Sequence, residues 1–268
     1  MNIFIINLES DRDRKEFMQK QLDYLQLNYD FIKASTPKDI KEFYLSVKNS
    51  WQRLLKETEV ACLHSHYRVW KKVINIDKPA LILEDDVLIS NKLKEIINYC
   101  KDLKNIDYIN LESTGRKKYL NLKSVISIPN IEYKIYKMYI DRSGTGGYII
   151  YPSGARKLVN KFKLNKLAPA DAFMKESNLN MFQIYPIALI QQCQANIYNL
   201  DTPFETESNI FTKPSVKYDS FGIYMKLKIN RLKAQLNQGV KLLKYFYRSK
   251  KVSIPIIKED FDYISKDL

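Results

Sequence analysis

Residues 80–87 read ALILEDDV, an apolar run that ends in three consecutive carboxylates. The apolar part predicts a buried strand whose end carries closely packed negative charge. Such a cluster costs free energy unless a cation lies beside it, and a divalent cation is the usual partner. Because ligands of α/β sheets bind at the carboxyl ends of the strands, the segment predicts a ligand site. A solvated acidic turn after a strand would give the same pattern.

The segments on either side of this run alternate between strand and helix patterns. A short apolar strand at residues 2–6 and a helix from Ser10 to Leu27 open the chain. The alternation predicts an α/β fold with a mainly parallel sheet. The expected helices are residues 10–27, 37–47, 58–74, 93–103 and 153–162, and the expected strands are residues 2–6, 31–32, 80–83, 108–111, 148–151 and 183–190.

The pattern changes after Gly115, where two strand-like segments, residues 125–128 and 133–139, follow each other without a helix between them. A mixed sheet is expected there. The glycine cluster at residues 144–147 precedes a strand and lacks the G-x-G-x-x-G spacing, so it is not a dinucleotide-binding loop. It predicts a tight turn or a close approach of a ligand to the backbone.

The composition is that of a globular protein. The chain has 268 residues, 45% of them hydrophobic, which suits one large domain or one domain with an appendage. The N-terminal apolar run ends at Asn7 and no other run is long enough to cross a bilayer, so neither a membrane span nor a secretory signal is predicted. Cys62, Cys100 and Cys193 are odd in number and widely spaced, which predicts buried free thiols and a cytoplasmic location.

The formal net charge is +14, and most of the excess lies in one segment. Residues 226–251 hold nine Lys and Arg and no acid. We therefore expect an α/β domain at residues 1–217 and a basic amphipathic helical extension at residues 218–268. Apolar side chains recur in the extension at three- and four-residue steps: Met225, Ile229, Leu232, Leu236, Val240, Leu243 and Tyr247. Such a stripe packs on the main domain or lies on an anionic membrane surface, and the sequence leaves both open.

Two further function classes fit parts of the sequence. The basic charge and 12% aromatic content suit a noncatalytic nucleic-acid-binding protein, but the confinement of the charge to one segment argues against it. A metal-dependent phosphohydrolase would use Asp85 and Asp86 on a nucleotide. The chain has no G-x-x-x-x-G-K-[ST] loop, so phosphoryl transfer of the P-loop kind is not expected.

The chemistry of the acidic segment, Glu84-Asp85-Asp86, favours a hard cation. Carboxylates without a Cys or His cluster beside them suit Mg²⁺ or Mn²⁺ rather than zinc, and such ions take further ligands from phosphate and water. A diphosphate-bearing substrate follows. His64 and His66 point about 200° apart on a helix, so they cannot chelate one metal together. His66 shares a helix face with Cys62 and Val69, which suits a packed core histidine as well as a site residue.

Six stretches of the chain occur in the order that a known family shares. They are residues 5–8 (IINL) with Ser10, Arg12 and Arg14; residues 59–62 (EVAC) with Ser65, His66 and Trp70; residues 81–86 (LILEDD); residues 144–148 (GTGGY); residues 169–171 (PAD); and Tyr185-Pro186 with Gln191. Together they resemble glycosyltransferase family 25, the group of lipooligosaccharide β-galactosyltransferases with collagen hydroxylysine galactosyltransferases as relatives. The resemblance covers roughly residues 1–200.

The resemblance implies a GT-A-like, Rossmann-type mixed sheet flanked by helices. It also implies a UDP-hexose donor, usually UDP-galactose with UDP-glucose as the alternative, and inversion at the anomeric carbon. A divalent cation, Mn²⁺ or Mg²⁺, would accompany the donor. The implied acceptor is a lipooligosaccharide or lipopolysaccharide core, so we expect an enzyme that works at the cytoplasmic face of the inner membrane and binds no nucleic acid.

The resemblance further assigns roles to single residues. Asp86 with Glu84 would hold the cation. Asp171 would be the base that removes the acceptor hydroxyl proton, with Asp141 in reserve, although a carboxylate at a helix N-terminus needs no such role. The residues expected at the donor are Asn7, Leu8, Arg12, Arg14, His66, Glu84, Asp85, Gly146 and Gly147.

Overall fold

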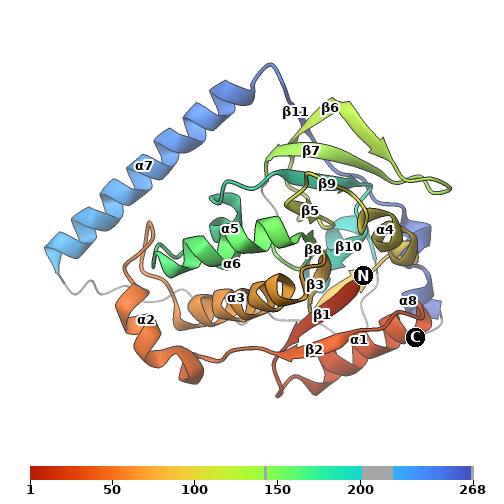
Figure 1. Ribbon diagram of the computed structural model, residues 1–268, viewed down its shortest axis with the longest axis horizontal. Helices are drawn as coiled ribbons and strands as arrows, with labels where there is room; N and C mark the ends of the chain where they lie inside the picture. The colour runs from red at the N-terminus through yellow and green to blue at the C-terminus, as the bar shows by residue number, and fades with distance from the viewer. Residues whose placement is uncertain (142–143, 201–219, 267–268) are drawn as a thin grey trace.

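The computed structural model describes residues 1–141, 144–200 and 220–266. Within them, a nine-stranded sheet in the order β11-β6-β7-β9-β5-β8-β3-β1-β2 forms the middle of the molecule (Figure 1). Its strands are β1 (Asn2–Asn7), β2 (Asp30–Lys33), β3 (Ala80–Glu84), β5 (Tyr108–Asn110), β6 (Lys118–Ser127), β7 (Lys134–Ile140), β8 (Gly147–Ile150), β9 (Met181–Tyr185) and β11 (Lys250–Val252). A separate pair joins β4 (Val87–Ile89) to β10 (Leu189–Gln191).

The predicted α/β fold with a mixed sheet is confirmed. Strands β2, β1 and β3 are parallel neighbours, whereas β9, β7, β6 and β11 follow one another antiparallel. Strand β8 lies between β3 and β5 and runs antiparallel to both. The start of β8 therefore meets the carboxyl end of β3, and Gly147 pairs with Leu83. This reversal brings the glycine cluster to the acidic segment.

Helices cover both faces of the sheet, with α3, α5 and α6 on one side and α1 and α4 on the other (Figure 1). Right-handed crossovers explain this arrangement, because the chain moves from β1 to β2 in one direction and from β2 to β3 in the other. The helices are α1 (Arg12–Tyr24), α2 (Lys41–Val47), α3 (Glu57–Ile76), α4 (Leu93–Cys100), α5 (Pro152–Lys163), α6 (Ala170–Lys175), α7 (Phe221–Tyr245) and α8 (Tyr263–Lys266), with 3₁₀ turns η1 (Pro37–Ile40), η2 (Gln192–Tyr198) and η3 (Lys258–Phe261).

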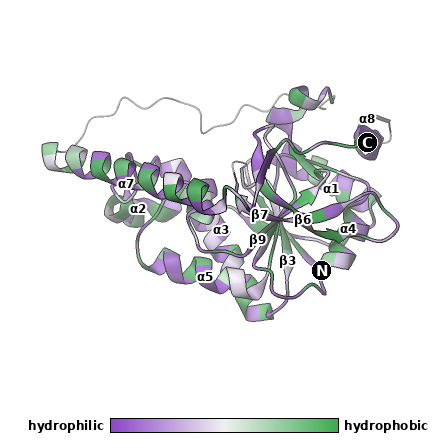
Figure 2. Cartoon of the chain, turned by 90° about the horizontal axis from the view of Figure 1, so that it is seen from above, coloured by the Kyte–Doolittle hydropathy of each residue, from purple (hydrophilic) through white to green (hydrophobic). Residues whose placement is uncertain are grey.

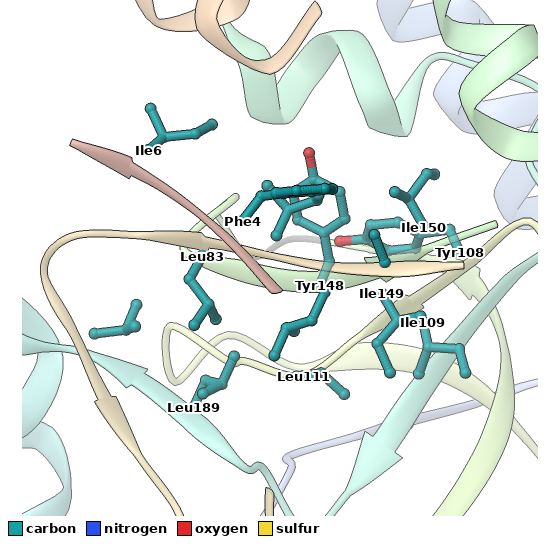
Figure 3. Close-up of a cluster of buried hydrophobic side chains, with 14 of the residues drawn as sticks. Phe4, Ile6, Leu83, Tyr108, Ile109, Leu111, Tyr148, Ile149, Ile150 and Leu189 are labelled. Atoms are coloured by element: carbon teal, nitrogen blue, oxygen red, sulfur yellow. The ribbon is translucent and has the colours of Figure 1, made fainter. Parts of the chain in front are cut away.

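The core lies where the central strands meet helix α3. Phe4 and Tyr148, from β1 and β8, point toward the helices there, whereas Leu83 of β3 points to the other face of the sheet, toward Leu189 (Figure 3). Each is at most 1% exposed, and burying one such side chain contributes about 1.5–3 kcal/mol. Helix α3 contributes Val69 and Trp70, both fully buried. This rigid layer supports the strand ends that carry the polar residues.

Two boundaries differ from the sequence expectation. The single strand predicted at residues 183–190 is two strands, β9 and β10, because Pro186 lacks the N–H that a continuous ladder needs. The short strand predicted at residues 125–128 is the end of the longer β6. Strand β4, which directly follows the acidic segment, was not predicted at all, because three residues are too few for a period to show.

The C-terminal region is only partly the helical extension that we expected over residues 218–268. Helix α7 is present, but after it the chain returns to the sheet as β11, which pairs antiparallel with β6. Phe261 and Tyr263 are then buried against the main core, and the Tyr263 hydroxyl donates to the carbonyl of Ile89 at 2.9 Å. The expected boundary between residues 217 and 218 lies outside the described residues.

Among the described residues, none of the helices combines the length and the apolar character that crossing a membrane requires. The three cysteines are free. Cys100 is buried and Cys62 is partly buried, but Cys193 is exposed, which corrects the expectation of three buried thiols. Cys193 lies in η2 at the rim of the strand ends rather than in the core.

Candidate active site

The carboxyl ends of β1 and β3 bring Asn7 to the acidic segment. These strands pair in parallel with Ile6 opposite Glu84, so both end at the same edge of the sheet. Asn7 is the last residue of β1, and its Nδ2 donates to Asp85 Oδ2 at 2.8 Å. Two stretches that are 78 residues apart in the chain therefore form one polar surface.

Asp85 is held from two sides. Arg14, in the first turns of α1, donates from Nη1 to Asp85 Oδ1 at 3.2 Å, while Asn7 binds the other oxygen. Burial raises the pKa of the Asp85 carboxyl, although the hydrogen bond from Asn7 and the charge of Arg14 oppose the rise. Two other residues were expected at the UDP-sugar donor: Arg12 is exposed, and Leu8 packs against the core. The structure thus brings Asn7, Arg14 and Asp85 together and leaves Arg12 open to solvent.

Asp86 carries the unbalanced charge of the segment. Its Oδ1 is buried and has no hydrogen-bond partner among the described residues. Burial, followed by the negative charges of Glu84 and Asp85, raises the pKa of Asp86 to about 7. A buried carboxylate oxygen without a donor is unfavourable, and a bound cation would remove the penalty. The donor set of Asp86 and its neighbours therefore fits a hard divalent ion.

Glu84, in contrast, is well supplied with donors. Its Oε1 accepts from Thr145 Oγ1 at 2.6 Å and lies 3.2 Å from His66 Nε2, and its Oε2 accepts from Gln191 Nε2 at 3.3 Å. Burial by itself would raise the pKa of Glu84, but the hydrogen bonds from His66, Thr145 and Gln191 hold this pKa below its usual range. Glu84 is therefore a carboxylate held in place by hydrogen bonds to both of its oxygens.

His66 is oriented by two aromatic side chains. Trp70 Nε1 donates to the hydroxyl of Tyr148 at 2.9 Å, and that hydroxyl lies 2.9 Å from His66 Nδ1. Since the indole N–H can only donate, the hydroxyl is free to donate to Nδ1, which leaves the His66 proton on Nε2, facing Glu84. His66 is fully buried. His64 lies elsewhere and shares a hydrogen bond with Ser35 Oγ at 2.8 Å, so the expectation that the two histidines do not act together agrees with the geometry.

The acidic segment does have a Cys and His group beside it, which sequence spacing did not reveal. Ligand atoms of Cys62, His66 and Glu84 lie within 4.8 Å of one another. Burial, followed by the negative charges of Glu84 and Asp171, raises the pKa of the Cys62 thiol. A neutral thiol is a poor ligand, and the His66 nitrogen that faces Glu84 is best assigned as a donor. The group therefore positions Glu84 rather than replacing Asp86 as the choice for a hard cation.

Gly146 and Gly147 serve close packing at the rim of the site. The amide of Gly146 donates to Glu112 Oε1 at 3.0 Å, and a Cβ there would lie 2.7 Å from Gln191 Cγ. A Cβ at Gly147 would overlap Leu189 Cδ1. The glycines allow β8 to approach β10 and let Gln191 reach Glu84.

Glu112 is a buried carboxyl group beside the glycine cluster, and the sequence reasoning did not predict it. Burial, followed by the charge of Glu84, raises the pKa of Glu112 to about 8. Its Oε2 has no hydrogen-bond partner among the residues that the structure describes. Lys118, also fully buried, forms an ion pair with Asp141 at 3.3 Å, and Asn110 donates to Asp141 at 2.9 Å. Glu112 follows an apolar strand just as Glu84 does, which is the signal that could have found it.

The two candidates for the base differ in accessibility. Asp171 is the second residue of α6, its side chain is 43% exposed, and Lys175 Nζ lies 2.8 Å from its Oδ2. Asp141, the reserve candidate, is 7% exposed and held by Lys118. Asp171 is therefore the more accessible of the two carboxylates.

Comparison with known sequences identifies the family. The model described as "Glycosyltransferase family 25 (LPS biosynthesis protein)" matches residues 1–174, which include the whole acidic segment, the glycine cluster and Asp171. The chain belongs to glycosyltransferase family 25. The predicted resemblance is thereby confirmed.

The relatives of this family 25 chain differ in length. It is 29% identical over 201 residues to procollagen galactosyltransferase 2 of Homo sapiens, a match that covers 69% of this chain and 31% of that protein. It is 26% identical over 214 residues to a putative glycosyltransferase of Haemophilus influenzae, covering 76% of this chain and 73% of that one. The chain thus spans about a third of the human protein.

A solved structure gives a slight overall likeness. It is the crystal structure of a glycosyltransferase involved in the glycosylation of the major capsid of PBCV-1, at 17% identity and a TM-score of 0.33. The match covers 63% of this chain and 68% of that one.

Proposed function

We propose that this protein is a divalent-cation-dependent, inverting glycosyltransferase that transfers galactose from UDP-galactose to the core of a lipooligosaccharide. The observation that carries the proposal is the orphaned, buried carboxylate oxygen of Asp86 at the strand edge that Asn7, Arg14 and Glu84 share. Family membership supports sugar transfer over a noncatalytic nucleic-acid-binding role or a phosphohydrolase. UDP-glucose, which differs from UDP-galactose at one hydroxyl, stays the alternative donor.

In this proposal the residues of the acidic segment have different tasks. Asp86 would hold Mn²⁺ or Mg²⁺, with Glu84 beside it, and the cation would supply positive charge against the departing diphosphate. Asp85, fixed by Asn7 and Arg14, would keep the segment in place. Glu84, fixed by His66, would stay ionised at neutral pH because of its lowered pKa.

The second substrate would react on the side of Asp171. In a direct displacement, the acceptor hydroxyl attacks the anomeric carbon opposite the leaving UDP, and a base takes up its proton. We assign that role to Asp171, because its side chain is 43% exposed and open to a second substrate, whereas Asp141 is buried and paired with Lys118.

An acceptor built on a lipid would place the enzyme at the cytoplasmic face of the inner membrane. The match to a family described as containing an LPS biosynthesis protein supports this acceptor class, while the relatives named procollagen galactosyltransferases support galactose as the sugar.

Thermal unfolding with nucleotides tests the proposal. UDP, GDP and CMP are each added with and without Mn²⁺, and a ligand at about 100 times its dissociation constant adds about 2.7 kcal/mol to stability. We expect stabilisation by UDP that requires Mn²⁺. Stabilisation by GDP or CMP instead would reject the donor class, and a UDP response that is the same without Mn²⁺ would reject the cation.

A further inference from the structure

Helix α7 turns its apolar side away from the rest of the protein. Its inner face is marked by Leu227, which is 2% exposed, by Asn230, which donates to the carbonyl of Trp51 at 3.0 Å, and by Tyr245, which stacks on a neighbouring ring. At 100° per residue, six apolar residues lie about 180° from this face. This apolar ridge consists of Met225, Ile229, Leu232, Leu236, Val240 and Leu243, which are 41% to 78% exposed.

The ridge decides a question that the sequence left open. A stripe that packs on the main domain would be buried, whereas Leu236 is 63% exposed and Leu243 is 78% exposed. Figure 2 shows α7 projecting along one side of the molecule, with hydrophobic and hydrophilic bands alternating along it. The helix is attached by its other face, so the ridge is presented outward.

Cations flank the ridge on both sides. Lys226, Lys233 and Lys244 lie on one flank and Lys228 on the other, at about 60–80° from the ridge by helical geometry. All four are exposed, and long lysine stems can lie along an apolar surface while their ammonium groups stay in water. An apolar ridge between two cationic flanks is the pattern of a helix that lies in the interface of an anionic bilayer.

Apolar surface continues past the end of the helix. Phe246 is 70% exposed and Tyr247 is 93% exposed. Beside them, an open groove of about 330 Å³ between α7 and the β6–β11 edge is lined by Leu242, Phe246 and Lys251, among others. The patch therefore extends from the ridge to the edge of the sheet.

Charge selects the occupant of this surface. A second copy of the chain would bring a second segment with nine cations and no acid against the first, which costs free energy. A nucleic acid would use the cations but leave the ridge in water. We infer that the apolar ridge of α7 docks on an anionic phospholipid bilayer, with the ridge in the acyl-chain boundary and the flanking lysines at the phosphates. The inference depends on the surface of α7 and is independent of the sugar donor and the cation of the proposed function.

Vesicle flotation with matched variants tests the inference. The ridge variant carries Leu236→Ser and Leu243→Ser, and the control carries Gln235→Ser and Gln238→Ser, at exposed positions of the same helix outside the ridge. Both pairs leave the charge unchanged and lower the helix propensity alike, because Leu and Gln rank together above Ser. The vesicles are phosphatidylcholine with phosphatidylglycerol, or phosphatidylcholine alone. We expect the ridge variant to bind anionic vesicles about 100-fold more weakly and the control to bind as the parent chain does. Binding should also weaken as salt is raised.

Three outcomes would overturn the inference: equal vesicle binding by both variants, equal binding to neutral and anionic vesicles, or a dimer in solution that the ridge variant dissociates while the parent chain leaves vesicles unbound. Galactose transfer to a short soluble acceptor is measured in parallel and should be the same for both variants. Normal transfer without vesicle binding rejects the membrane surface alone. Vesicle binding without any UDP and Mn²⁺ response rejects the proposed function alone.

Discussion

Replacing Asp86 by Asn should stabilise the metal-free protein above pH 7 and remove its response to Mn²⁺. Burial and the charges of Glu84 and Asp85 raise the pKa of Asp86 from 3.8 to about 7. A carboxyl group whose pKa is raised on folding favours the folded state while it is protonated. Its contribution is therefore fully present below about pH 4 and is lost as the pH rises through about 7.

The magnitude follows from the same values. One pKa unit is about 1.36 kcal/mol, so the full rise from 3.8 to about 7 corresponds to about 4 kcal/mol of stability lost on ionisation. Asn cannot ionise and keeps the shape of the side chain. We expect the free energy of unfolding of Asp86→Asn to exceed that of the parent chain by about 2–4 kcal/mol at about pH 8 and to match it near pH 4.

Urea unfolding across this pH range, first with EDTA and then with Mn²⁺, measures both effects. Asp102→Asn, at an exposed position after α4, is the matched control and should change neither. Saturating Mn²⁺, at about 100 times its dissociation constant, should add about 2.7 kcal/mol to the parent chain and nothing to Asp86→Asn. If Asp86→Asn is no more stable than the parent chain at pH 8 and still responds fully to Mn²⁺, the assignment of Asp86 is wrong.

Three further predictions concern single contacts of the site. Asp171→Asn should leave UDP binding unchanged and lower turnover by about 10²–10⁴-fold in a transfer assay, and near-normal turnover would remove Asp171 as the base. Tyr148→Phe removes the hydroxyl that binds His66 Nδ1, so it should lower the free energy of unfolding in urea by about 1–3 kcal/mol. It should also shift the ¹⁵N resonances of His66, which is one of only two histidines in the chain. Unchanged resonances would contradict the orientation of His66 described above. Gly147→Ala would force a Cβ into Leu189 and should cost about 1–3 kcal/mol, a cost that must shrink in a Leu189→Ala background if the overlap is its cause.

Local patterns in the sequence predicted most of the architecture. The alternation of apolar strands and amphipathic helices reports which face of each element is buried, and that period is set by backbone geometry alone. This alternation did not predict β4, which is too short to show a period, or residues 250–266, where the chain rejoins the sheet after a long helix. Pairing between β11 and β6 joins segments more than a hundred residues apart and leaves no local signal.

The site was predicted in part for the same reason. Carboxylates at the end of an apolar strand are visible in the sequence, so the acidic segment could be inferred, whereas Asn7 was expected at the donor only from the family resemblance. Its hydrogen bond to Asp85 was seen only in the structure. The different hydrogen bonding of the three carboxylates, Glu84, Asp85 and Asp86, could not be inferred from the sequence. Glu84 is satisfied by donors from three other elements, one of them 107 residues away, while Asp86 keeps an unpartnered oxygen.

The sequence by itself determined an α/β chain, an acidic strand end, membership of a family and a basic amphipathic helix near its C-terminus, because each of these is written in local spacing or in ordered motifs. Only the tertiary structure decided that β8 runs antiparallel beside β3, which delivers Thr145 to Glu84, and that α7 is attached by the face opposite its apolar ridge. Both depend on which distant surfaces meet, and the free energy of such contacts belongs to the assembled fold rather than to any segment of the chain.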